Sequence, residues 1–363
     1  MPDDSIARRI VQTSLRIHED DMVLIETWQH TMDLASDIAL ESLRTGAKPL
    51  ITLMTDRLWW KALEEVPEQY LRKTPKHILN AIESTTVWIG LGGPEDPTRF
   101  REVPSSRLEP FFEADKPVVD KTVERKIRSL QVLLGDVTPQ RARAYGFDYT
   151  RWLRSTEEAM RVDYPKITEL GRRIAGRLER GSKIHVTSKV GTDIRFDIAR
   201  RPAHVQDGIV DEEDMARGLF STQLPSGKVE VAPIETTARG RVIFDTPRAL
   251  KGRLIADLEL SFEKGHVNEF HAKKYEDVFR EVFEATQGDK DRIGHFAIGL
   301  NPKIELIGYP SDELALGTVT IGIGANKGNG GQNDSSFEFS GTLTRPTVEI
   351  DGSPLMTDGR LIF

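Results

Sequence analysis

The chain contains no cysteine among its 363 residues. This absence excludes disulfide bonds, thiolate metal sites, iron–sulfur clusters and cysteine nucleophiles. Any metal ion must therefore be held by histidine nitrogens or carboxylate oxygens. Eight histidines are present, and none of them belongs to a His-Glu-x-x-His or a His-x-His motif.

Positive charge and long apolar runs are also scarce. Lys and Arg total 50 against 57 Asp and Glu, which gives a net charge of -7. A nucleic-acid binder should instead carry a basic patch or domain. No stretch approaches the roughly 20 apolar residues that a membrane helix needs. Asp3 and Asp4 stand where a secretory signal peptide carries positive charge. We therefore expect a cytoplasmic protein that binds neither nucleic acid nor membrane.

Phosphate-binding loops are missing as well. The turn after the first predicted strand, residues 26–30, reads Glu-Thr-Trp-Gln-His. It contains neither Gly-x-Gly-x-x-Gly nor a Gly-Lys-Ser/Thr loop. Gly92 and Gly93 follow another predicted strand, but Pro94 removes a backbone donor there. We interpret these glycines as turn residues, and the sequence does not predict nucleotide binding.

The first half of the chain alternates between helical and strand patterns. Apolar runs predict buried strands at residues 22–26, 49–54, 86–91 and 129–134. Helical spacing of apolar residues lies between them or before them, as at 5–18 and 32–43. Strands separated by helices indicate βαβ units and a mostly parallel sheet. We therefore predict an α/β N-terminal domain over residues 1–155, one of two or three domains in a chain of this length.

The pattern changes after a charged helical stretch at residues 155–179. Short strands with Gly and Pro between them are predicted at 184–187, 194–198, 229–232, 241–244, 254–262, 318–323 and 347–350. One helix interrupts them at 275–286. This pattern predicts an α+β C-terminal domain over residues 156–363, rich in antiparallel strands. A Gly/Asn-rich loop at 324–333 is the first place to look for a site, because functional residues concentrate on loops held by a rigid sheet.

Several short motifs in a fixed order resemble the metallo-aminopeptidase T and S family, also called the thermophilic metalloprotease family. They are Gly191-Thr192-Asp193, Leu224-Pro225-Ser226-Gly227, Ala232-Pro233, Gly240, Lys251-Gly252, Phe262-x-x-Gly265-x-Val267, Gly299-x-Asn301-Pro302, Gly317-Thr318-Val319, Pro346-Thr347-Val348-x-x-Asp351-Gly352 and Asp358-Gly359. The resemblance covers nearly the whole chain. It implies an α/β domain followed by a C-terminal domain that carries a two-metal site.

The resemblance also implies which positions should hold the metal ions, and most of them are changed here. Lys228 stands where the family has a Glu ligand, and His295 stands where it has a second Glu. Thr320 replaces a His ligand, and Lys327 replaces a catalytic Tyr. The family's His-x-Asp falls on Glu338-Phe339-Ser340.

These replacements reduce the number of metal ligands predicted at the site. A protonated Lys offers only hydrogen-bond donors, so Lys228 cannot be a ligand. His295 and Glu338 could hold at most one divalent ion (Zn, Mn, Co or Fe), with Asp334 or Glu230 as helpers. A dihydroxypyridine ring-cleaving dioxygenase branch is similar across the same scaffold and uses a Gly-His pair, which Gly294-His295 matches. Its iron triad needs two His and one carboxylate, and one of each is present.

Three hypotheses follow. The first is an aminopeptidase-like hydrolase of a small amide or a short peptide, with a reduced or absent metal site. Its catalytic residues would be His295, Glu338 and Lys228, and its substrate-binding residues would be Lys327, Thr320 and Ser340. The second is a non-catalytic homologue that retains fold and dimer, and the third is a single-iron, ring-cleaving enzyme. We place the hydrolase first because titratable groups of both signs fill the altered positions.

The resemblance also predicts a homodimer. In the family, two subunits pair through their C-terminal domains and enclose the sites in a shared cavity, which restricts substrates to small molecules or short peptides. We expect the loop at residues 324–333 to border that cavity. We also expect Lys327 to point into it rather than toward bulk solvent.

Overall fold

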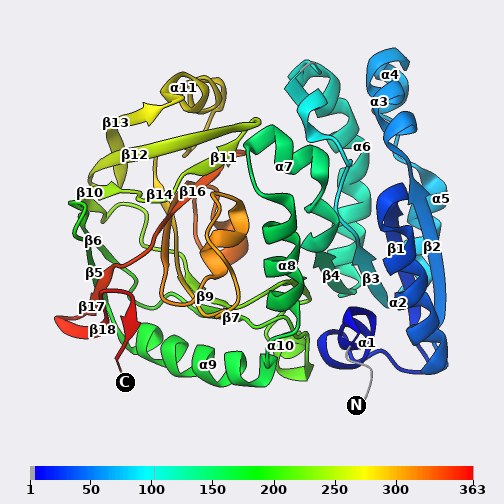
Figure 1. The fold of residues 1–363 in the computed structure, drawn as a ribbon, viewed down its shortest axis with the longest axis horizontal. Coiled ribbons are helices and arrows are strands. Elements are labelled where there is room, and N and C mark those ends of the chain that lie inside the picture. The colour runs from blue at the N-terminus through cyan, green and yellow to red at the C-terminus, as the bar shows by residue number, and fades with distance from the viewer. Residues whose placement is uncertain (1–4, 102, 363) are drawn as a thin grey trace. The chain divides into compact units, whose positions relative to one another are not determined.

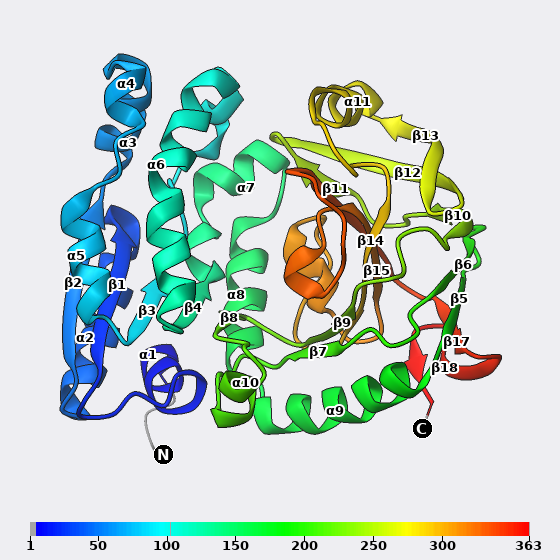
Figure 2. The same cartoon turned by 180° about the vertical axis from the view of Figure 1, so that it is seen from behind.

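The structure is a computed structural model that describes residues 5–101 and 103–362. The acidic N-terminus with Asp3 and Asp4 lies outside the described residues. The chain forms two compact units, one of residues 1–161 with 208–225 and the other of residues 162–207 with 226–363. Figures 1 and 2 show the ribbon from opposite sides. No helix within the described residues is long and apolar enough to cross a membrane.

The first unit is built on a five-stranded sheet in the order β2-β1-β3-β4-β8. The strands are β1 Met22–Trp28, β2 Lys48–Met54, β3 Val87–Gly90, β4 Arg128–Val132 and β8 Ser221–Leu224. Every neighbouring pair in this sheet is parallel. The parallel α/β N-terminal region predicted from the alternating pattern is therefore confirmed.

Helices connect and cover these parallel strands. They are α1 Ile6–Arg9, α2 Met32–Arg44, α3 Asp56–Glu65, α4 Glu68–Leu71, α5 Lys76–Ser84, α6 Ser105–Glu124, α7 Pro139–Tyr145, α8 Tyr149–Met160 and α10 Glu212–Ala216. The helix predicted at 5–18 is α1 followed by a π-helix at Ile10–Ser14. Ile82 of α5 and Val118 of α6 are buried together with Leu24 of β1 and Ile127, so both helices cover the same part of the sheet.

The second unit holds two antiparallel sheets, which we call sheet B and sheet C. Sheet B has the order β11-β12-β10-β6-β5-β17-β18-β19, with β13 paired to β12, and sheet C has the order β16-β15-β14-β9-β7. The strands of sheet B are β5 Lys183–Thr187, β6 Asp193–Asp197, β10 Arg239–Ile243, β11 Arg248–Leu250, β12 Arg253–Glu263, β13 His266–Lys274, β17 Thr347–Ile350, β18 Ser353–Thr357 and β19 Arg360–Leu361. Those of sheet C are β7 Ala203–Gln206, β9 Lys228–Val231, β14 Ile293–Gly299, β15 Val319–Gly324 and β16 Glu338–Leu343. The antiparallel α+β prediction is confirmed.

The helical stretch predicted at residues 155–179 is two helices, α8 in the first unit and α9, Tyr164–Arg180, in the second. The Asp163 side chain accepts a hydrogen bond from the Lys166 backbone N–H and caps α9, with Pro165 in its first turn. An N-cap and an early proline are the usual start of a helix. The sequence places one domain boundary near residue 155, whereas the first unit also takes in residues 208–225 because β8 pairs with β4.

Sheets B and C pack against each other through apolar side chains. The rings of Phe196 on β6 and Phe296 on β14 lie 5.3 Å apart, centroid to centroid. Helix α9 contacts β7 and β9. A side-chain carbon added at Gly171 of α9 would lie 2.5 Å from Val205 of β7, so a glycine is needed for this close approach. Sheet C is therefore packed against both sheet B and helix α9 within the second unit.

Candidate active site on sheet C

Sheet C has one apolar face and one polar face. Successive strand residues point to opposite faces. The side of sheet C that contains Phe296 packs on sheet B. The other side carries polar residues, because the register aligns His204, Glu230, Ala297, Thr320 and Thr342 in one row across five strands. We call this side the polar face.

The polar face brings together five of the six side chains predicted to form the site. Thr320 lies in the row described above, and His295 and Ser340 flank Gly322 in the neighbouring row. Lys228 lies two residues before Glu230 on β9, and Glu338 lies two residues before Ser340 on β16, so both side chains point to the same face. The sixth, Lys327, lies outside the strands in the 3-10 helix η6, Lys327–Asn329.

Lys228 is the centre of a buried charge cluster. Its Nζ lies 2.9 Å from Glu230 Oε2 and 3.0 Å from Glu313 Oε1, and only 8% of its side chain is exposed. Burial alone would lower the pKa of Lys228, but the two carboxylates outweigh it and raise the pKa above its ordinary value. The ammonium is therefore charged at neutral pH. The remaining oxygen of Glu230 accepts a hydrogen bond from Gln206 Nε2 at 2.5 Å.

Glu313 reaches the polar face from a loop rather than from a strand. It belongs to the 3-10 helix η5, Pro310–Leu314. The chain of this segment lies directly on Gly299, where an added side-chain carbon would be 2.7 Å from the Glu313 carbonyl oxygen and 2.1 Å from that of Ala315. Gly299 therefore permits the close approach that places the Glu313 carboxylate beside Lys228.

His295 lies next to this cluster in a buried position. Its Nδ1 is 3.7 Å from Glu230 Oε2, and its Nε2 is 3.9 Å from Glu313 Oε2. Nδ1 has no hydrogen-bond partner among the described residues. Burial, and then the nearby positive charge of Lys228, lower the pKa of His295. The imidazole is therefore neutral at pH 7 and able to accept a proton.

Hydroxyl groups and one arginine complete the polar face. The Thr320 hydroxyl lies 3.0 Å from the Thr342 hydroxyl. Arg248 of β11 donates from Nη2 to Ser340 Oγ at 3.3 Å. Burial lowers the pKa of Arg248, while the charges of Glu313 and Asp312 oppose this effect. A guanidinium stays protonated in proteins, so two cations, Lys228 and Arg248, act on this face.

Glu338 and Lys327 lie apart from the buried cluster. The Glu338 side chain is exposed at the start of β16, although its charge acts on His295 and Arg248. Lys327 is 60% exposed and pairs with Asp334 at 2.8 Å. The structure therefore gathers Lys228, His295 and Ser340 and leaves Lys327 on another segment.

The residues of the cluster do not fit a divalent metal ion. Two carboxylates and an imidazole are a suitable donor set, but the Lys228 ammonium occupies the position between the carboxylates and has no lone pair to offer. In the part of the chain that the structure describes, no group of three or more His, Asp or Glu side chains is arranged to hold a metal ion. Neither His295 nor Glu338, predicted as ligands, belongs to such a group.

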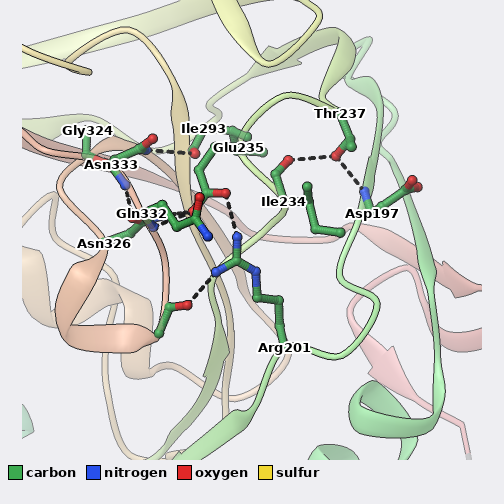
Figure 3. Close-up of polar contacts among 11 residues, drawn as sticks. Asp197, Arg201, Ile234, Glu235, Thr237, Ile293, Gly324, Asn326, Gln332 and Asn333 are labelled. Carbon is green, nitrogen blue, oxygen red and sulfur yellow. Dashed lines mark hydrogen bonds and ion pairs between the residues drawn. The ribbon is translucent and has the colours of Figure 1, made fainter.

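The Gly/Asn-rich loop at residues 324–333 forms a wall of a separate cavity of about 590 Å³. Glu235 fixes this loop by accepting hydrogen bonds from Asn326 Nδ2 at 3.0 Å and from the Gln332 backbone N–H at 2.7 Å. Figure 3 shows Arg201 pointing at the same carboxylate, with which it forms an ion pair. Asn333 in turn donates to the Ile293 and Gly324 carbonyls. The loop is therefore held by a hydrogen-bond network, despite its glycine content.

Sequence reasoning missed two members of the site. Glu313 and Arg248 come from segments with no recognisable motif, and only the fold brings them to the polar face. Glu230 was considered solely as a helper to a metal ion. Its position two residues after Lys228 in a strand is a signal that both share a face.

Comparison of the sequence with known proteins finds a metalloprotease family and aminopeptidases. Residues 4–309 match the family described as thermophilic metalloprotease (M29). Aminopeptidase T of Thermus aquaticus is 27% identical over 197 residues, which are 48% of this chain and 47% of that protein. The matched segment thus spans about half the length of this curated relative.

Two solved structures share the fold. Wild-type AmpT from Thermus thermophilus superposes with a TM-score of 0.77 at 20% identity, covering 99% of this chain and 98% of that one. A 2,5-dihydroxypyridine dioxygenase from Pseudomonas putida KT2440 superposes with a TM-score of 0.66 at 15% identity, covering 99% and 96%. Proteins with this fold therefore include enzymes of two different kinds, and the function has to be argued from the residues of the site.

Proposed function

Because the chain belongs to the thermophilic metalloprotease (M29) family, as its motifs predicted, we propose that it is an aminopeptidase-like hydrolase. Its substrate would be a small amide or a short peptide, cleaved on the polar face of sheet C. The observation that supports this proposal is the buried cluster of Lys228, Glu230, Glu313 and His295. Buried titratable groups with perturbed pKa values are typical of catalytic sites.

In this proposal His295 is the general base. Its lowered pKa leaves the imidazole unprotonated, and the unpartnered Nδ1 is free to take a proton from water. The water oxygen then attacks the carbonyl carbon of the amide. The proton held by His295 passes to the leaving nitrogen as the carbon–nitrogen bond breaks. The two steps together move one proton from water to the leaving nitrogen, and the imidazole ends in the neutral form in which it began.

Lys228 and Arg248 would stabilise the negative charge that develops on the carbonyl oxygen. An ammonium has three N–H donors, and two of those on Lys228 are directed at Glu230 and Glu313. The third is available for the oxyanion, which gains most from fixed donors in a site that excludes water. Arg248 supplies a second positive charge beside Ser340.

The remaining predicted residues would contact the substrate. Thr320 and Ser340 present hydroxyl groups on the same face as His295. Glu338 at the open end of the face would bind the substrate's amino group or act as a second acid–base group. Lys327 would contribute only if the loop that carries it borders the site in an assembly.

We further propose that the protein is a cytoplasmic homodimer whose site holds at most one divalent ion (Zn, Mn, Co or Fe) or none. The family name implies a divalent metal, but the cluster geometry disfavours the usual two. Static light scattering tests the dimer, since a monomer would exclude a cavity shared between subunits.

Amide hydrolysis is tested with aminoacyl amides, dipeptides and tripeptides, by measuring release of the free amine. We expect the wild type to cleave members of this set and His295→Gln to lose about 10²- to 10⁴-fold in kcat, the usual contribution of a general base. His271→Gln is the matched control, because His271 is an exposed histidine on β13. Equal rates for His295→Gln and the wild type would contradict the assignment.

A further inference from the structure

In the Lys228 cluster, one buried positive charge is shared by two buried negative charges. One ammonium lies within hydrogen-bonding distance of two carboxylates, and the side chains of Lys228, Glu230 and Glu313 are all largely buried. Buried charges are stable only when paired and hydrogen-bonded. Lys228 is thus the shared counter-ion of both carboxylates, and its removal would leave two buried negative charges with Arg248, whose charge acts on Glu313, as the remaining cation of the face.

His295 is a third potential ligand around the same position. Each ring nitrogen lies just under 4 Å from one of the two carboxylates, and Nδ1 makes no hydrogen bond among the described residues. Two carboxylates and an imidazole are a donor set that suits divalent ions. In this chain the Lys228 ammonium lies between the two carboxylates, where such an ion would bind them.

We infer that Lys228 is the resident cation of this site and that it excludes a divalent metal ion. Glu230, Glu313 and His295 are not arranged as a metal site while the ammonium lies between the carboxylates, and they close on a divalent ion only when Lys228 is replaced. This inference rests on the proposed function in placing the site on the polar face. The proposed function allows at most one divalent ion per site, whereas this inference predicts that the wild-type site holds none. It follows from charge: a divalent ion would neutralise the two carboxylates once the ammonium is absent, and would be repelled by a fixed positive charge while the ammonium is present.

The alternative is a purely structural ion pair with no relation to metal binding. In that case replacing Lys228 would destabilise the protein, and no metal ion would reverse the effect. The two interpretations therefore differ in one measurable property, the response of the Lys228 variant to a divalent ion.

The experiment compares the wild type with Lys228→Met, which keeps the length of the side chain and removes its charge. Both proteins are purified without chelator, and metal content per chain is measured by mass spectrometry after equilibration with Zn²⁺ or Mn²⁺ and removal of free ion. Thermal unfolding is then measured with each ion and with a chelator. Lys189→Met is the matched control, because Lys189 is an exposed lysine of the same unit.

We expect the wild type and Lys189→Met to bind no metal at this site and to unfold at the same temperature with ion or chelator. We expect Lys228→Met to unfold at a lower temperature in chelator, to regain stability with Zn²⁺ or Mn²⁺, and to bind one ion per chain. Adding Glu313→Gln to Lys228→Met should abolish that binding, because it removes one of the three ligands.

The inference would be overturned if the wild type bound one metal ion per chain, and if both the ion and the stability of the protein were lost on chelation and in the Glu313→Gln variant. A folded Lys228→Met protein that binds no ion would overturn it as well. Lys228→Gln serves as a second variant, and failure of both to fold even with metal present also counts against it, since an ion should replace the ammonium. All these readouts are binding and stability. A wild type that cleaves no amide would therefore refute the proposed function and leave this inference standing.

Discussion

Asp21 in the first unit is a buried carboxylate that accepts several hydrogen bonds. It accepts hydrogen bonds from Arg128 Nη2 at 2.5 Å, Thr86 Oγ1 at 2.7 Å and the His18 backbone N–H at 2.9 Å. Burial alone would raise the pKa of Asp21, but the hydrogen bond from Arg128 and the others outweigh it and lower the pKa. The ionised Asp21 carboxylate is therefore more stable in the folded state than in the unfolded chain.

The pH dependence of stability follows from this shift. A carboxyl with a lowered folded-state pKa stabilises the fold above its unfolded pKa of about 3.9, and that contribution disappears as the pH falls through the folded value. We expect Asp21→Asn to lose about 1.5–3 kcal/mol of unfolding free energy at pH 7, the range for hydrogen bonds to a charged group. Denaturant unfolding between pH 7 and pH 3 should show a shallower acid loss than in the wild type. Asp20→Asn, an exposed neighbour, should behave like the wild type, and an unchanged acid loss in Asp21→Asn would contradict the prediction.

At the scale of single residues, the sequence predicted members of the site but not their partners. The resemblance pointed to Lys228 and His295 because both occupy positions that normally hold ligands, and the register of sheet C places them on one face. Glu313 could not be predicted in the same way. It reaches Lys228 only because η5 lies on Gly299, and no local pattern specifies that long-range contact.

At the scale of elements, the loop at residues 324–333 depends on Glu235. This carboxylate is buried and links Arg201 to Asn326 and Gln332. Removing one partner of a buried ion pair leaves the other charge uncompensated, which costs about 3–5 kcal/mol. We therefore expect Glu235→Ala to destabilise the protein by an amount in this range and to speed amide hydrogen exchange in the loop.

The measurement is hydrogen exchange by mass spectrometry together with denaturant unfolding. Glu269→Ala on β13 is the control, because Glu269 is exposed. Glu235→Gln should fall between the wild type and Glu235→Ala, since its amide oxygen still accepts hydrogen bonds while its charge is lost. Wild-type exchange rates in the loop of Glu235→Ala would show that glycine composition, rather than this network, sets its mobility.

Strands with a strong apolar signal were predicted from the sequence, and strands with mostly polar residues were not. The apolar runs of β1 and β3 can be recognised in the sequence because a buried parallel strand has an almost continuous hydrophobic segment. The strands that the sequence did not predict are β7, β8, β11, β13, β16, β18 and β19. β7 and β8 have four residues each, and their polar side chains resemble a loop in a single sequence. Their pairing partners, rather than their own residues, make them strands.

At the scale of the whole molecule, the chain forms its first unit from two separate stretches. The second stretch, residues 208–225, supplies β8, which pairs in parallel with β4 from Ser129↔Ser221 to Val132↔Leu224. Without it, β4 would be an edge strand with a row of unpaired backbone groups, which favours aggregation. A parallel neighbour must come from a distant part of the chain, so no boundary drawn at one residue can describe this unit.

This topology predicts how fragments of the chain should behave. A fragment of residues 1–161 lacks β8, and we expect it to aggregate or to unfold at a lower denaturant concentration. The loss should amount to several kcal/mol, since each backbone hydrogen bond contributes about 1 kcal/mol and the burial of Leu224 is lost as well. Joining residues 208–225 to that fragment through a flexible Gly/Ser linker should restore cooperative unfolding, measured by circular dichroism in urea. The same linker carrying a scrambled 208–225 segment is the control, because it adds equal length without the β8 pattern. If the 1–161 fragment alone unfolded as cooperatively and at the same midpoint as the joined one, β8 would be an accessory strand rather than part of the folding unit.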